Sequence, residues 1–398
     1  MSLMERLRRR GRVATLATIS ALRGTIFSIW GVIWQPFVLS LGVPMTSLGG
    51  LESLLDLTVI IVQPLVGRAS DAYGRRRFII VRDILILAAA VTYVFASNWT
   101  HIFIGVVFSG MSSAIYPVWN ALIAESSEPS ELGHTYSIIG SFHLGVGLVA
   151  TLATGFVAKT YGFRTVFGSA TFLGLLCLVV VWLRLPETMA KTDSSPPRWR
   201  EIAGTLINSF KPPRYMWGWY AAMSLDLFAF NMGHRLLNGM LSSGYGFTPD
   251  MLGITVSAMT GAMALSQILL GRLADRLGYV RFLFLSQVMA VVSLGLVIFS
   301  KDFYSVIAAQ VIMGVAGGLW SPAEQAWIAS NVDKERRGQE ISSYGTFRGL
   351  IAFPAPFIGG LLFDRFGFNA PIAINLVLAL VDAVLILVLV KDRVRPPG

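Results

Sequence analysis

Two tryptophans flank a carboxylate within a long apolar run of this sequence. Trp320, Glu324 and Trp327 are spaced so that a helix would place all three on one face. Indole rings attract cations, and a carboxylate adds its own charge, so this stripe could bind an organic cation. Aromatic stripes also occur in packed cores and interfacial belts, and that alternative stays open for Trp327.

A second stripe begins at an arginine. Its members, at helical spacing, are Arg23, Phe27, Trp30 and Trp34. A charge in the middle of an apolar helix needs a partner or a water-filled cavity. Asp56 lies at a similar depth in the next apolar run. We expect it either to form an ion pair with Arg23 or, next to Glu52 one turn away, to form a carboxylate pair that carries a proton.

Three further ionisable residues interrupt apolar runs. Asp226 has no obvious partner nearby in the sequence, so we expect it either to be protonated and hydrogen-bonded or to face a cavity. His143 and Arg348 stand 205 residues apart, at equivalent places of a repeat. They could bind an anion together, or Arg348 could neutralise Glu324 while His143 titrates near neutral pH. We expect the substrate site to include also Tyr116, Asn120 and Asn231.

The elements that carry these residues are long and apolar. Of 398 residues, 54% are hydrophobic and only 14% are charged, whereas soluble domains carry about 25% charged residues. Because open sheets do not span lipid, we predict an all-α membrane protein with twelve transmembrane helices. These lie near residues 13–41, 47–66, 78–97, 101–124, 135–158, 165–185, 214–242, 250–270, 280–299, 303–329, 340–362 and 369–390. The single Cys177 excludes a disulfide within the chain.

The basic residues indicate the orientation. Most of the 32 lysines and arginines fall in alternate loops, which predicts that both termini are cytoplasmic. We therefore assign the net charge of +10 to membrane loops and not to nucleic-acid binding. The longest polar stretch, rich in serine and proline, predicts a cytoplasmic linker over 186–213 between six-helix halves at 1–185 and 214–398.

The two halves are pseudo-symmetric duplicates. An offset of 204 places residues 67–71 on 271–275, and after one inserted residue an offset of 205 pairs Gly133 with Gly338 and Gly155 with Gly360. Parallel repeats of this kind place a binding site at their interface near the middle of the bilayer.

The loop after the second run combines glycines, an aspartate and arginines at Gly67, Asp71, Gly74, Arg75 and Arg76. This pattern resembles the signature of the major facilitator superfamily, and Leu185-Pro186-Glu187-Thr188 is also similar to that family. The resemblance implies a twelve-helix secondary transporter that works as a monomer.

A conformational latch is the role that we expect for this loop. An aspartate can cap a neighbouring helix, and the arginines can hold acidic headgroups and carbonyl ends. A solvated basic loop would explain the arginines alone. It would not explain the second copy at Gly271, Asp275 and Gly278.

We therefore expect a proton-driven transporter, working by alternating access, that exports a small amphipathic solute, cationic or neutral and aromatic, across a prokaryotic plasma membrane. The alternative is an organic-anion transporter that uses Arg23, His143 and Arg348. The sequence lacks a phosphate-binding loop, a histidine metal pair and a nucleophile elbow. We expect neither an enzyme nor a bound metal or cofactor, and we expect the partners to be the solute, protons and membrane lipids.

Overall fold

A computed structural model gives the fold of the chain. It describes residues 3–126, 132–187, 204, 211–332 and 337–391. Every regular element in these segments is a helix. Ten of the helices are long and apolar enough to span a membrane. The predicted all-α membrane fold is confirmed.

The two other predicted spans depart from that criterion for local reasons. One is α3 (Arg75–Val94), which carries Arg77, Arg82 and Asp83 in its interior. The other is divided into η1 (Arg214–Met216), α9 (Trp217–Met232), η2 (His234–Leu236) and α10 (Leu237–Tyr245).

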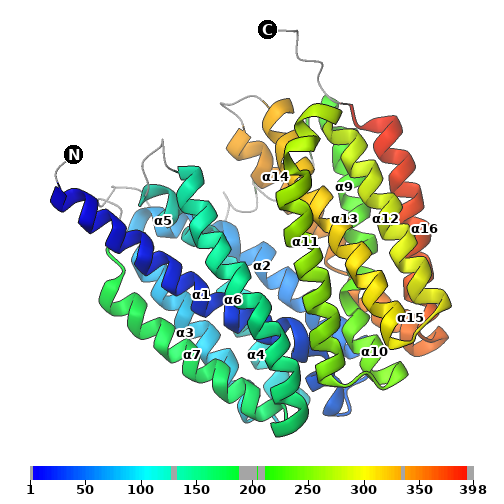
Figure 1. Ribbon diagram of the computed structural model, residues 1–398, viewed down its shortest axis with the longest axis horizontal. Coiled ribbons are helices and arrows are strands. Elements are labelled where there is room, and N and C mark those ends of the chain that lie inside the picture. Colours follow the sequence, from blue (N-terminus) through cyan, green and yellow to red (C-terminus); the bar gives the residue numbers. More distant parts are fainter. Residues whose placement is uncertain (1–2, 127–131, 188–203, 205–210, 333–336, 392–398) are drawn as a thin grey trace. The chain divides into compact units, whose positions relative to one another are not determined.

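The first of two compact units comprises residues 1–42, 54–202 and 248–253. Its helices are α1 (Leu3–Ser40), most of α2 (Met45–Tyr73), α3, α4 (Trp99–Ala114), α5 (Tyr116–Glu125), α6 (Leu132–Tyr161) and α7 (Phe163–Arg184). Helix α1 packs along α6, and α3 packs against both α4 and α7 (Figure 1). Helix α7 contacts both α1 and α3, and an ion pair joins Arg23 near the middle of α1 to Asp83 near the middle of α3.

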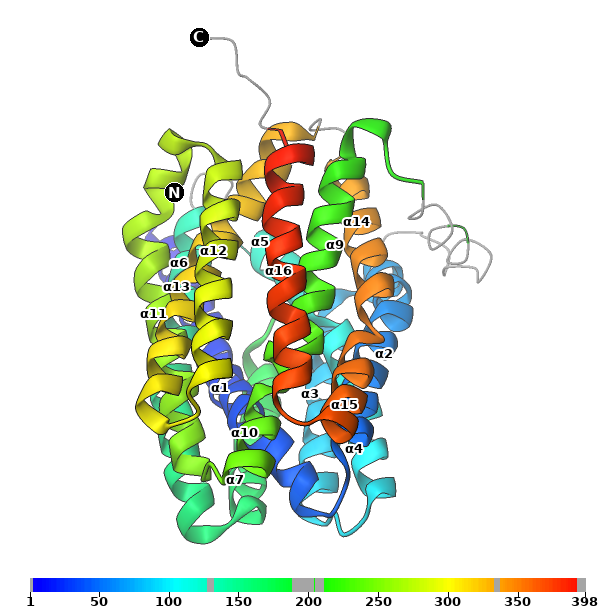
Figure 2. The same ribbon diagram turned by 90° about the vertical axis from the view of Figure 1, so that its right-hand side faces the viewer.

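The second unit comprises residues 43–53, 203–247 and 254–398. After η1, α9, η2 and α10 come α11 (Pro249–Leu277), α12 (Tyr279–Phe299), α13 (Phe303–Asn331), α14 (Arg337–Ala352), α15 (Ala355–Phe366) and α16 (Asn369–Leu389). Helices α9, α16 and α12 lie side by side (Figure 2). Most of the predicted linker lies outside the described residues, and its limits stay a prediction.

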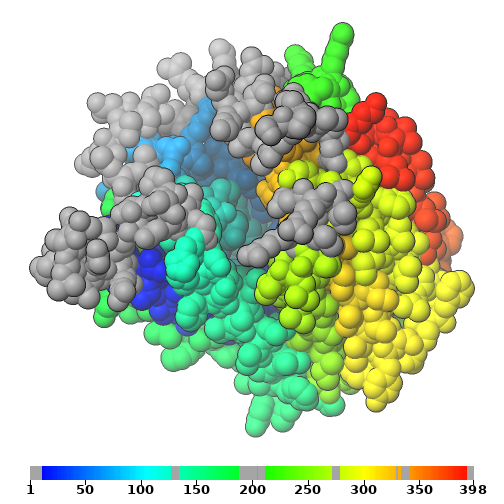
Figure 3. Space-filling view, turned by 45° about the horizontal axis from the view of Figure 1, so that its top comes forward, coloured from blue at the N-terminus to red at the C-terminus, as the bar shows by residue number. Residues whose placement is uncertain are grey.

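The surface of the second unit is apolar where a bilayer would contact it. Helix α16, drawn in red, forms part of this surface (Figure 3). Its exposed side chains include Val377, Val384, Leu387 and Val388. In water such a surface would be costly, whereas lipid tails solvate it well.

The internal repeat is confirmed in the backbone. Gly74 precedes α3 with a φ of 94°, and Gly278 precedes α12 with a φ of 91°. Gly162 before α7 and Gly367 before α16 also have nearly equal φ values, 82° and 81°. Left-handed φ values favour glycine, so the same turn residues recur at the offsets of 204 and 205.

Helices α2 and α11 exchange their first turns between the units. Residues 43–53 of α2 belong to the second unit, where Asp364 on α15 accepts hydrogen bonds from the Thr46 amide at 2.7 Å and the Thr46 hydroxyl at 2.6 Å. Residues 248–253 belong to the first unit, where Lys159 on α6 contacts Asp250 at 2.8 Å. Thr46 is equivalent to Asp250, and Lys159 to Asp364. The same contact is therefore made twice with different side chains.

Close backbone approach accompanies these contacts. A Cβ atom added to Gly360 on α15 would overlap the carbonyl oxygen of Met45, and one added to the equivalent Gly155 on α6 would overlap that of Pro249. Because backbone atoms cannot rotate away as a side chain can, both positions require glycine.

We expect Gly360→Ala to destabilise the protein by about 1 to 3 kcal/mol, the usual cost of overpacking. The control is Gly345→Ala on α14, where no atom lies within 4 Å of an added Cβ. That change should be neutral or stabilising by about 0.5 to 1 kcal/mol. Thermal unfolding in detergent measures both. Equal melting temperatures for the two variants would show that the close approach is absent in solution.

Candidate functional site

A buried polar network links three helices of the second unit. The Nε2 atom of Gln287 on α12 donates to Asp226 on α9 at 2.7 Å and to Asp382 on α16 at 2.8 Å. Asp382 is fully buried, and its Oδ1 atom has no hydrogen-bond partner. Asp226 is therefore hydrogen-bonded, which is part of one of the two alternatives that the sequence left open, and its partners come from helices distant in the sequence.

Arg348 on α14 joins a second carboxylate to this network. Its guanidinium lies 2.5 Å from Glu324 and 3.4 Å from Asp226. The other donors to Glu324 are the Tyr344 hydroxyl at 2.8 Å and the Trp320 indole at 3.0 Å. Arg348 thus neutralises Glu324, which is one of the two arrangements that the sequence left open. The network holds three carboxylates and one guanidinium.

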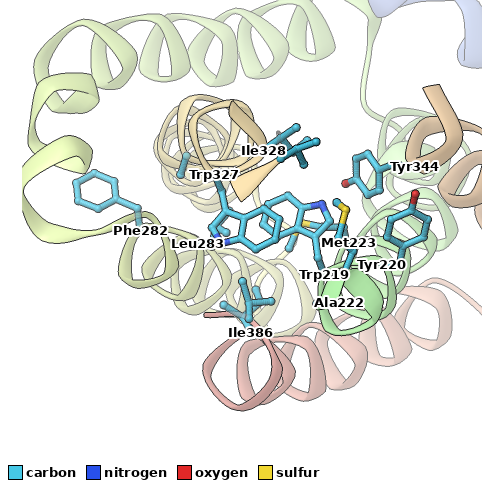
Figure 4. Close-up of a cluster of buried hydrophobic side chains, with 14 of the residues drawn as sticks. Trp219, Tyr220, Ala222, Met223, Phe282, Leu283, Trp327, Ile328, Tyr344 and Ile386 are labelled. Carbon is cyan, nitrogen blue, oxygen red and sulfur yellow. The ribbon is translucent and has the colours of Figure 1, made fainter. Parts of the chain in front are cut away.

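Trp327 belongs to the hydrophobic core of this unit. Its ring stacks on Trp219 with centroids 3.8 Å apart and planes 2° apart (Figure 4). It is 3% exposed, and its indole nitrogen donates to the Lys391 carbonyl at 3.3 Å. Of the two indoles expected around Glu324, Trp320 therefore contacts it, whereas Trp327 packs against Trp219 on α9.

The first unit holds an ion pair that the sequence analysis misassigned. Arg23 on α1 binds Asp83 on α3 with Nη2 at 2.7 Å from both carboxylate oxygens, and not Asp56 as expected. The guanidinium also lies 4.4 Å from the ring centre of Trp119. Cys177 on α7 donates to Asp83 at 3.9 Å, a distance typical of sulfur. Arg23 therefore contacts a carboxylate and an indole ring, and the same carboxylate also accepts the thiol of Cys177.

The aromatic residues that follow Arg23 lie in different surroundings. Trp30 and Trp34 pack against Tyr93 at 5.8 and 5.0 Å between ring centres, within an aromatic cluster. Phe27, in contrast, is 71% exposed, and its ring centre lies 6.2 Å from that of His143. Of these three rings, Phe27 is the one most accessible to a ligand.

Arg82 is a partly buried residue that the sequence analysis did not select. It precedes Asp83, and its Nη1 atom lies 4.0 Å from that carboxylate. Both Nη1 and Nε are buried without a hydrogen-bond partner. The guanidinium lies 6.0 Å from the ring centre of Tyr116, which is half exposed. The Nδ1 atom of His143 on α6 lies 3.2 Å from the carbonyl oxygen of Ser20.

The remaining predicted site residues are dispersed. Glu52 forms an ion pair with Arg235 at 2.7 Å. The carboxylate pair of Glu52 and Asp56 stays a prediction. Asn231 is buried. Asn120 is half-buried, and its carbonyl accepts the Tyr136 hydroxyl at 2.6 Å.

The loop between α2 and α3 is held by charged contacts. Arg75 pairs with Asp71 at 3.1 Å and with Glu125 at 2.5 Å. The cap of α3 is Glu187, which accepts the backbone amides of Arg75 at 3.0 Å and Arg76 at 3.2 Å, and not Asp71. Glu187 lies in the stretch that resembles the family after the sixth predicted span. The side chain of Asp275, in the second copy of this pattern, lies outside the part of the chain that the structure describes.

The repeat offers a signal for the missed residues. Asp83 is equivalent to Gln287 at an offset of 204, and Cys177 to Asp382 at an offset of 205. Arg23 and Asp226 differ by 203. Each unit thus joins its first, third and last long helices through polar side chains at corresponding depths. A search for polar residues at paired offsets would have selected these positions.

Comparison with known proteins agrees with this architecture. The chain is 25% identical over 368 residues to the quinolone resistance protein NorA of Staphylococcus aureus, which covers 90% of this chain and 91% of that protein. It is 25% identical over 374 residues to the multidrug resistance protein MdtG of Enterobacter lignolyticus, over 91% of this chain and 88% of that protein. An uncharacterised transporter of Methanocaldococcus jannaschii is 23% identical, over 92% and 94% of the two chains.

Solved structures share the fold. The nucleoside transporter NupG superposes with a TM-score of 0.81 at 13% identity and covers 95% of this chain and 100% of its own. The human organic anion transporter MFSD10 gives a TM-score of 0.66 at 16% identity, over 95% and 99% of the two chains. The family model described as Major Facilitator Superfamily matches residues 16–242 and again residues 227–398. The chain is a multi-pass integral membrane protein that belongs to the major facilitator superfamily of transporters.

Proposed function

We propose that this transporter couples the export of a small amphipathic solute to proton entry by alternating access. The observation that carries the proposal is the network of Asp226, Glu324 and Asp382 around one guanidinium, that of Arg348. If all three carboxylates were ionised, the network would hold an excess of negative charge in an apolar interior, which is costly. Binding a proton removes part of that excess.

Export is supported by the names of two relatives. The quinolone resistance protein and the multidrug resistance protein are each named for resistance to toxic compounds. Removal of the compound from the cell is the activity of a transporter that best explains such a name. We extend this activity to the present chain together with the predicted cytoplasmic termini and the plasma membrane.

Asp226→Asn should abolish uphill, gradient-driven transport and preserve substrate binding, because an amide keeps the hydrogen-bonding shape but cannot release a proton. The measurement is accumulation of a fluorescent amphipathic compound in proteoliposomes with an imposed pH gradient.

Asp302→Asn is the matched control for this experiment. Asp302 caps α13 through the Tyr304 and Ser305 amides, and asparagine caps equally well. Hydrogen bonds from the hydroxyl groups of Ser300 and Ser305 lower the pKa of Asp302, so it stays ionised at neutral pH. Uphill flux that persists in Asp226→Asn would remove this residue from the coupling mechanism.

The contacts of Glu324 support a structural ion pair over an open cation site. Each of its oxygen atoms accepts a hydrogen bond, and its guanidinium partner is close. A cationic substrate would have to displace Arg348. A residue that selects substrates by their charge should therefore be sought elsewhere in the protein.

Glu324→Gln should destabilise the protein by about 3 to 5 kcal/mol because it leaves the largely buried guanidinium of Arg348 with a weakened partner. The double change Glu324→Gln, Arg348→Gln should restore part of that loss. Thermal unfolding of the four proteins in this cycle measures the coupling. For comparison, the cycle for Lys159 and Asp250, whose lysine is 53% exposed, should give less than about 1 kcal/mol.

If the double variant were no more stable than Glu324→Gln, the ion pair would be contradicted. If Glu324→Gln then also weakened cationic compounds by about 1 to 2 kcal/mol and spared neutral analogues, the cation site would be the better explanation.

We further propose that the loop between α2 and α3 acts as a conformational latch. Arg75 links Asp71 and Glu125, while Glu187 holds the start of α3. Movement of this loop would have to break these contacts together, which gives the latch a defined resting state.

Asp71→Ala should leave the protein folded and change the populations open to the two sides of the membrane. Labelling of single cysteines introduced in place of the exposed Phe27 and Tyr116, in a Cys177→Ser background, reports accessibility. Arg77→Gln, at an exposed position in the first turn of α3, is the control. Identical labelling rates in Asp71→Ala and its parent would exclude the latch.

A further inference from the structure

Arg82 lies beside an ion pair that is already complete. The carboxylate of Asp83 accepts three hydrogen bonds from Arg23, at 3.1, 2.7 and 2.7 Å, and its Oδ2 atom also accepts the thiol of Cys177. Arg82 approaches the same carboxylate only to 4.0 Å, which is longer than a hydrogen bond. Its Nε and Nη1 atoms are buried and have no acceptor.

The positive charge in this part of the first unit exceeds the negative charge. The ionisable groups that interact with Arg82 include Arg23, Asp83, Cys177, Tyr116 and His143. Among them Asp83 is the one carboxylate, and it faces two guanidinium groups. A buried cation with unmade hydrogen bonds is costly, so an anionic group that reached Arg82 would gain both charge and hydrogen bonds.

Accessible aromatic surface adjoins this charge. Tyr116, whose ring centre lies 6.0 Å from the Arg82 guanidinium, is 52% exposed. His143 interacts electrostatically with both Arg82 and Arg23, and the exposed ring of Phe27 lies beside His143. A molecule with an aromatic body could therefore lie against these rings while its charged end contacts the guanidinium.

We propose that Arg82 binds the anionic group of an aromatic amphipathic molecule: a carboxylate, a sulfonate or a phosphate. The guanidinium offers paired donors that suit such planar or tetrahedral oxygens. The inference rests on the proposed function only in taking the bound molecule to be the transported solute. An acidic lipid headgroup carries the same chemistry, and the test separates the two sources.

The test uses the purified full-length chain in nanodiscs of phosphatidylcholine, with isothermal titration of 2-naphthoate and its neutral analogue 2-naphthamide. We expect the carboxylate to bind at least tenfold more tightly than the amide, since charged hydrogen bonds contribute about this much. Arg82→Gln should remove the difference, and Arg82→Lys should retain part of it. Arg77→Gln, an exposed arginine on the same helix, should retain all of it.

Thermal unfolding shows whether a variant loses binding because it has lost its fold. Because Arg82→Gln removes a charge that lacks a full partner, its melting temperature should be unchanged or higher than that of the parent. An arginine needed only for the fold would behave differently: the variant would melt several degrees lower, and Arg82→Lys would show no preference for the carboxylate. That combination overturns the proposal, as does an unchanged preference in a stable Arg82→Gln protein.

Nanodiscs that contain phosphatidylglycerol identify the natural source of the anion. Weaker 2-naphthoate binding in these discs, seen in the parent and not in Arg82→Gln, assigns the site to a lipid headgroup. Equal binding in both lipids assigns it to the solute. Absence of any preference for the carboxylate in either lipid overturns the site.

Failure of this inference is distinguishable from failure of the proposed function. Gradient-driven flux without a preference for the carboxylate would leave the transporter proposal intact and remove the anion site. The preference without any flux would do the reverse.

Discussion

An apolar, all-helical interior tolerates a charge only if another helix supplies its partner, and the interior of both units follows from this constraint. In the first unit α1 brings Arg23 to Asp83 on α3. In the second unit α9 brings Asp226 to Gln287 on α12. Since no water competes for these groups in lipid, each contact fixes the rotation and depth of the two helices that make it.

The two polar centres occupy equivalent places and differ in charge. The first centre combines an arginine, an aspartate and a cysteine, and the second combines an aspartate, a glutamine and an aspartate. Exchange of a cation for an acid at one position, and of a thiol for an acid at another, leaves the first centre with one guanidinium and one carboxylate and makes the second centre acidic. A duplicated scaffold thus provides two chemical environments without a change in backbone.

The sequence predicted the helices and their duplication because lipid imposes length and apolarity, and because turns such as those at Gly74 and Gly278 need glycine. It did not predict the partner of Arg23. Depth can be counted along a chain, but the choice between Asp56 and Asp83 depends on the rotation of α2 and α3, which packing decides. Trp327 was ambiguous for a similar reason, since its helical face is shared by Glu324 and by the core that contains Trp219.

The exchanged helix ends mean that neither half of the repeat is chemically complete. A fragment that ends near residue 185 would keep Met45 and Thr46 but lose Asp364, the acceptor of their amides. The complementary fragment would keep Asp250 without Lys159. Each fragment would also expose a glycine surface shaped for the other's backbone. Each piece therefore keeps the groups that contact the other piece, as in a split protein whose parts reassemble when they are produced together.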